Sequence, residues 1–152
     1  MIPAPITLFV YNRPLHTRQT VEALQKNDLA SDSDLFIFSD APKTAAQADA
    51  VREVREYVHK ITGFKSITVV ERETNFGLAR SIIEGVTELC EKYGRVIVLE
   101  DDLITSPHFL RFMNDALELY KDEDQVMHIS GSLYPIDAMQ CETFFFRVPL
   151  CW

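Results

Sequence analysis

Short runs of β-branched and aromatic residues alternate with longer amphipathic stretches from the N-terminus to Ser132, and this alternation limits the fold more than any other feature. The short runs are nearly continuous in apolar residues, as expected for strands buried on both faces of a sheet. The longer stretches carry apolar residues three and four positions apart, the spacing of one helix face. The order predicts a three-layer α/β/α fold with a mostly parallel, Rossmann-like sheet.

Six strands and four helices are expected from this pattern. The strands are predicted at residues 6–11, 35–39, 66–71, 95–99, 126–130 and 144–148. The helices are predicted at residues 14–26, 45–61, 78–93 and 107–121. No linker, repeat or low-complexity segment separates them, so residues 1–152 are expected to form one domain.

Composition and charge exclude several classes of protein. The chain has 152 residues, of which 47% are hydrophobic, and a net charge of -8. The hydrophobic fraction is sufficient for a core, and the negative charge argues against binding to nucleic acid or anionic membranes. Three cysteines without CxxC spacing predict neither a disulfide framework nor a zinc site. With no signal peptide and no apolar run of membrane-spanning length, we expect a soluble, cytoplasmic protein without a transmembrane segment.

The last 20 residues depart from the alternation and finish on an aromatic residue, Trp152. We expect from this that the fold is cut before its end, although Trp152 could instead close the core. A cut there would expose apolar side chains, so self-association through the truncated edge is also expected.

Polar residues follow each of the first four predicted strands, and parallel strands place such residues on one edge, where ligands of open α/β sheets bind. Among them, the triplet Glu100-Asp101-Asp102 leaves a buried strand directly. Three adjacent carboxylates repel one another unless a cation or hydrogen-bond donors offset the charge. Mg²⁺ or Mn²⁺ prefers such oxygen ligands. The alternative is a solvated acidic turn ahead of the helix that follows.

Other residues of this edge are weaker candidates, and each has an ordinary alternative. Asp40 could accept a hydrogen bond from a base or a ribose, or could be a loop residue. Arg13 could pair with a phosphate, or could be a surface arginine. The stretch from Asn75 to Arg80 could present free amides and Arg80 to a diphosphate, or could be a capped helix start.

The triplet in its context, with His128-Ile129-Ser130-Gly131-Ser132 after the next helix, resembles the nucleotide-sugar-binding half of GT-A glycosyltransferases. The resemblance is closest to the inverting N-acetylglucosaminyltransferase type that acts on mannose of N-glycans, and to related bacterial family 2-like sugar transferases. It implies a nucleotide-sugar donor, UDP-linked, and a glycan or other hydroxyl acceptor as partners.

The same resemblance implies roles for individual residues. Asp102 is implied as the ligand of Mn²⁺ or Mg²⁺ on the donor diphosphate, with Glu100 and Asp101 toward the ribose or the sugar. Arg13 and Asp40 are implied to hold the uridine, and the stretch of Asn75 and Arg80 resembles the Asn-x-Gly segment of the wider family. The catalytic base of the family lies well downstream of the triplet, and we expect it beyond Trp152.

Three other functions share features with this prediction. A sugar nucleotidyltransferase would need a Gly-rich basic loop after the first strand, where this chain has Asn12-Arg13-Pro14. A receiver-like signalling module would need an acidic pair after the first strand and a lysine after the fifth. The third alternative is a nucleotide-binding module without catalytic activity, which no feature of the sequence excludes.

Overall fold

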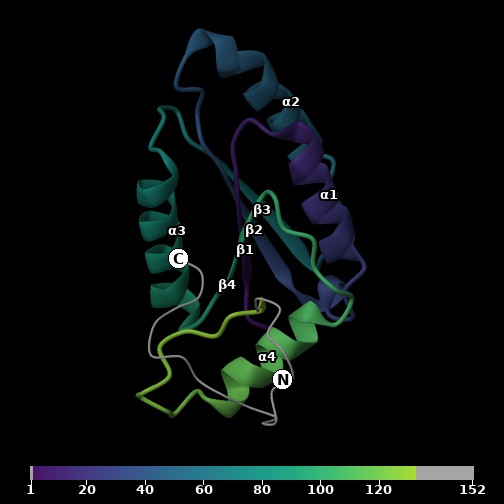
Figure 1. Cartoon of the computed structure of the whole chain (residues 1–152), viewed down its shortest axis with the longest axis vertical. Helices are drawn as coiled ribbons and strands as arrows, with labels where there is room; N and C mark the ends of the chain where they lie inside the picture. The colour runs from purple at the N-terminus through teal and green to yellow at the C-terminus, as the bar shows by residue number, and fades with distance from the viewer. Residues whose placement is uncertain (1, 133–152) are drawn as a thin grey trace, which may run out of the picture.

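The computed structural model describes residues 2–132, which form an α/β domain (Figure 1). Its elements follow the predicted alternation of strands and helices. In chain order they are β1 (Ile6–Val10), α1 (Pro14–Gln25), η1 (Ala30–Asp32), β2 (Asp34–Ser39), η2 (Ala45–Gln47), α2 (Ala48–Val58), β3 (Ser66–Glu71), α3 (Leu78–Tyr93), β4 (Ile97–Glu100) and α4 (Phe109–Leu119).

The sheet is parallel throughout, with strand order β3-β2-β1-β4. Ile6 of β1 stands opposite Leu35 of β2 on one side and Ile97 of β4 on the other. The chain adds β2 and β3 on one side of β1 and then returns to add β4 on the other side. The direction of strand order therefore reverses between β1 and β4, and such a reversal opens a crevice beyond the carboxyl ends of the two strands.

Helices cover both faces of the sheet, which confirms the three-layer prediction (Figure 1). Alternate strand residues such as Leu8 and Ile37 face one core, which α1, α2 and α4 complete. The side chains between them, Phe9 and Phe38, face a smaller core under α3. These two rings stack with centroids 5.3 Å apart. A Cβ at Gly85 of α3 would lie 3.0 Å from both rings, so this glycine permits the close approach of the helix.

Two predicted helices are shorter in the structure, one predicted strand is absent from the described residues, and the other boundaries differ by at most two residues. The helix expected at 107–121 begins at Phe109, because residues 107 and 108 form a turn closed by the Phe109 N–H and the Ser106 carbonyl. The helix expected at 45–61 is a 3-10 turn followed by the shorter α2. The strand predicted at 144–148 lies outside the described residues.

Residues 126–130 are not a strand, contrary to the prediction. Their apolar side chains do not line one buried face: Met127 is 95% exposed, whereas Ile129 packs against the larger core. A Cβ at the nearby Gly131 would collide with the ring of Phe109, so the chain here runs over α4 instead of beside β4. Within residues 2–132, no helix is long and apolar enough to cross a membrane.

Candidate functional site

The carboxyl ends of all four strands meet at one edge of the sheet, as parallel pairing requires. This edge gathers the polar residues that follow each strand, and it includes the point between β1 and β4 where strand order reverses. Two groups of side chains form there. One lies at this reversal and the other lies beyond β2 and β3.

The first group, here called the crevice cluster, consists of Arg13, Asp101 and Asp102. Arg13 immediately precedes α1, whose first position is Pro14, and its guanidinium crosses from the end of β1 to the end of β4. Arg13 Nη1 donates to Asp102 Oδ2 at 2.8 Å, and Nη2 pairs with Asp101 Oδ1. One arginine therefore offsets the repulsion of two adjacent carboxylates that the sequence predicts.

Asp101 is the buried member of this cluster. It is 2% exposed, and its Oδ2 has no hydrogen-bond partner among the described residues. Burial raises the pKa of the Asp101 carboxyl, although the Arg13 guanidinium and the Tyr11 backbone N–H act in the opposite direction. Burial also opposes the charge of Arg13, but the two carboxylates outweigh it and raise the pKa of that guanidinium. The cluster is a carboxylate pair with an unsatisfied oxygen inside it.

We expect Asp101→Asn to raise the midpoint of thermal unfolding of the metal-free protein by a few degrees at neutral pH, because it removes a buried charge. The pKa of Asp101 in the folded protein lies above the ordinary value of 3.8. Ionising this carboxyl therefore lowers the stability of the fold as pH rises from the ordinary pKa through the raised one. The difference in unfolding midpoint between the variant and the wild type should therefore vanish at acid pH, where both side chains are neutral. Thermal melts of both proteins across acid and neutral pH test this, and a lower midpoint for the variant at neutral pH would contradict it.

The second group, here called the Asp40 turn, consists of Asp40 and residues 75–77. Asp40 is 8% exposed and directly follows β2. Its Oδ1 accepts the N–H groups of Ala41 at 2.9 Å and Phe76 at 2.8 Å. Its Oδ2 accepts the Gly77 N–H at 2.8 Å and Asn75 Nδ2 at 3.1 Å. The carboxylate thus ties the end of β2 to the turn that starts α3, a role that the sequence does not predict.

Two arginines contact the ring of Phe76 in this turn. The Arg80 guanidinium is 3.8 Å from the ring centroid, and that of Arg72 is 4.7 Å from it. Arg80 also donates from Nε to Glu84 Oε1 at 2.7 Å and is 60% exposed in its side chain. Contacts of this kind are attractive because the ring face is negative, so they hold Arg80 beside the start of α3.

The structure therefore divides the residues predicted for the site between the two groups. Arg13, Asp101 and Asp102 lie in the crevice cluster, and Asp40, Asn75 and Arg80 lie at or beside the Asp40 turn. Glu100 is half-buried at the end of β4, opposite Phe9 of β1. Arg13 is placed with the acids and not with Asp40, with which the resemblance grouped it. Contacts of any of these residues with a nucleotide stay predictions.

The crevice cluster fits a hard divalent cation. Within residues 2–132, no three His, Cys, Asp or Glu side chains gather closely enough to enclose a metal ion by themselves. Mg²⁺, however, is commonly held by one or two carboxylates, with waters and substrate phosphates completing its shell. Asp101 and Asp102 supply that pair, and the unpartnered Asp101 Oδ2 supplies an oxygen that a cation would satisfy.

Three residues of this edge have roles that the sequence does not predict, although Tyr11 and Arg72 are expected at strand ends there. The Tyr11 hydroxyl donates to Gln47 Oε1 at 2.7 Å and accepts the Lys43 N–H at 2.9 Å, which ties the end of β1 to the segment before α2. Arg55 of α2 bonds to the ends of β2 and β3, and Arg72 lies over Phe76. An arginine on a helix or after a strand carries no local signal of such partners. For Tyr11 a signal existed, because it directly precedes Asn12 and Arg13, which are expected at this edge.

Comparison with solved structures supports the α/β fold, and a glycosyltransferase is among the proteins of similar fold. The crystal structure of S. aureus TarS, a glycosyltransferase, matches with a TM-score of 0.53 and 14% sequence identity over 78% of this chain. The chain spans 20% of the length of TarS. At this identity the likeness concerns the fold alone. No protein-family model and no curated protein sequence matches the chain.

Proposed function

We propose that this chain is the donor-binding part of a metal-dependent inverting glycosyltransferase that uses a nucleotide sugar, UDP-linked. The glycosyltransferase-like fold supports the class of reaction. The observation that supports metal dependence is the crevice cluster: two carboxylates at the reversal of strand order, held by one arginine, with a buried oxygen left unsatisfied. The inverting mechanism and the UDP-linked donor rest on the sequence resemblance.

The proposed division of labour follows the two groups of side chains. Asp102 is 42% exposed in its side chain and would reach a cation that also contacts the donor diphosphate. Asp101, beneath it, would orient that cation and the Arg13 guanidinium. When bound, the cation would neutralise charge on the leaving diphosphate. Arg80, beside the amides that begin α3, would add a further positive charge on the phosphate side.

A calorimetric titration of UDP, with Mn²⁺ present and with EDTA in its place, tests the proposal. Carboxylates alone repel a diphosphate, so UDP should bind at least about tenfold more tightly with the cation present. A parallel titration of Mn²⁺ without nucleotide measures the cation site by itself. Equal affinity for UDP in EDTA would show that the crevice cluster is not the metal site of a donor complex.

A further inference from the structure

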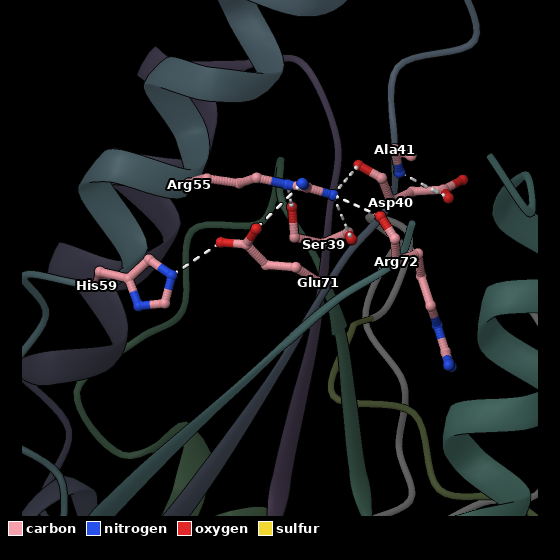
Figure 2. A network of polar contacts seen from close by, with 7 residues as sticks. All are labelled: Ser39, Asp40, Ala41, Arg55, His59, Glu71 and Arg72. Carbon is pink, nitrogen blue, oxygen red and sulfur yellow. Dashed lines mark hydrogen bonds and ion pairs between the residues drawn. The ribbon is translucent and has the colours of Figure 1, made fainter. Parts of the chain in front are cut away.

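Arg55 of α2 reaches across the ends of β2 and β3 and joins them (Figure 2). Its Nη2 donates to the carbonyl oxygens of Arg72 at 2.9 Å and of Ser39 and Asp40 at 3.4 Å each. Nε donates to Ser39 Oγ at 3.2 Å, and Nη1 pairs with Glu71 Oε2 at 3.0 Å. One guanidinium thus binds main-chain oxygens of two strand ends.

The geometry requires an arginine. The parallel ladder of β2 and β3 ends at the pair of Ser39 and Glu71, so the carbonyl groups beyond that pair need other donors. A guanidinium presents five N–H donors in a rigid fork, whereas a lysine presents a single ammonium point. The side chain is 23% exposed, and His59 Nε2 lies 2.8 Å from Glu71 Oε1 on the far side. Glu71 is therefore held between Arg55 and His59 (Figure 2).

Two of the carbonyl groups that Arg55 binds belong to the residues that hold the Asp40 turn. Asp40 accepts the amides of Phe76 and Gly77 with its carboxylate, and Arg72 lies over the Phe76 ring. These bonds of Arg55 end on Ser39, Asp40, Glu71 and Arg72, and none of them reaches residues 75–77. An effect of Arg55 on the turn must therefore pass through the main chain of Asp40 and Arg72.

We propose that Arg55 is a positioning residue for the nucleotide side of the site: it sets the main chain of Asp40 and Arg72, and through them the turn at residues 75–77 and Arg80. The identity of the ligand rests on the proposed function. The mechanical coupling from α2 to the turn does not, because it is read from contacts within the chain alone.

The chain offers a matched control on the same helix. Arg52 stands one turn before Arg55, is 66% exposed in its side chain, and forms ion pairs with the side chains of Asp49 and Glu56. Arg52→Met removes an arginine from α2 without touching a strand end. Arg55→Met removes the guanidinium and all its bonds to the two strand ends. Arg55→Lys keeps the positive charge but not the array of N–H donors.

Amide hydrogen exchange of the full chain, resolved residue by residue by NMR, measures the coupling without any ligand. In Arg55→Met the amides of Phe76 and Gly77 should exchange at least about tenfold faster than in the wild type and in Arg52→Met. Amides in the middle of β1 and β4 should keep their protection. Where Arg55→Met fails to fold, Arg55→Lys carries the comparison. Unchanged exchange at residues 76 and 77, or a uniform rise throughout the core, would overturn the proposal.

Titrations with UDP and with Mn²⁺ alone then separate the two sides of the site. Arg55→Met should weaken UDP binding in Mn²⁺ by about tenfold or more. The affinity for Mn²⁺ measured without nucleotide should not change, because Asp101 and Asp102 lie beyond β4. An equal loss for both ligands would overturn the positioning role. If the wild type itself binds no UDP, the proposed function is wrong, and the exchange rates still decide the coupling of Arg55 to the turn.

Discussion

Asp40→Asn should lower the free energy of unfolding by about 3 kcal/mol, because hydrogen bonds to a charged group are worth roughly 1.5 to 3 kcal/mol and this carboxylate accepts several. Its two oxygens take the N–H groups of Ala41, Phe76 and Gly77 and the amide of Asn75. Asparagine keeps one acceptor oxygen and turns its NH₂ group toward N–H donors. The donors on that side are then left unpaired at a site that is 8% exposed.

Chemical denaturation of the two proteins measures this loss, with Asp49→Asn as the control. Asp49 is 86% exposed in its side chain and pairs with Arg52 on the surface of α2, so its substitution should change stability little. We also expect Asp40→Asn to weaken UDP binding, since the turn at 75–77 loses its anchor. If Asp40→Asn were as stable as Asp49→Asn, the carboxylate would not hold the turn.

Asp102→Asn should remove most of the Mn²⁺-dependent part of UDP binding, a loss of about 100-fold, because ligating groups and their immediate supports dominate metal affinity. The amide oxygen that replaces the carboxylate carries no charge to balance the cation. The substitution should have little effect on folding, since Asp102 is 42% exposed and Arg13 keeps its contact with Asp101.

Titration of UDP in Mn²⁺ and in EDTA, for the wild type, Asp102→Asn and Asp115→Asn, tests this second expectation. Asp115 is exposed on α4 and is not a member of the crevice cluster. It therefore serves as a matched Asp-to-Asn control. The EDTA titrations of all three proteins should agree. Full Mn²⁺-dependent affinity in Asp102→Asn would exclude this carboxylate as a metal ligand.

The amino-acid sequence by itself determined the layers and most of the sheet. The runs at 6–11, 35–39, 66–71 and 95–99 each coincide with a strand within two residues. Burial explains the apolar composition of β1 and most of β2, whereas every residue of β3, at the end of the strand order, is half-buried or exposed, contrary to the expectation for a strand covered on both faces. The run at 126–130 carries similar residues, but whether such a run pairs with a sheet depends on a neighbouring strand and not on its own composition. Local pattern therefore located the four strands and misassigned this segment.

The sequence also identified which residues would share one edge, because parallel strands bring their carboxyl ends together. Only the tertiary structure decided their partners. Arg13 meets Asp101 and Asp102 across 88 and 89 residues of chain, and Asp40 meets Phe76 and Gly77 across 36 and 37. Arg55 reaches two strand ends from a helix whose sequence carries no sign of it. Such contacts depend on strand order, on register and on the reach of long side chains, and these are set when the helices pack on the sheet rather than by any local stretch of residues.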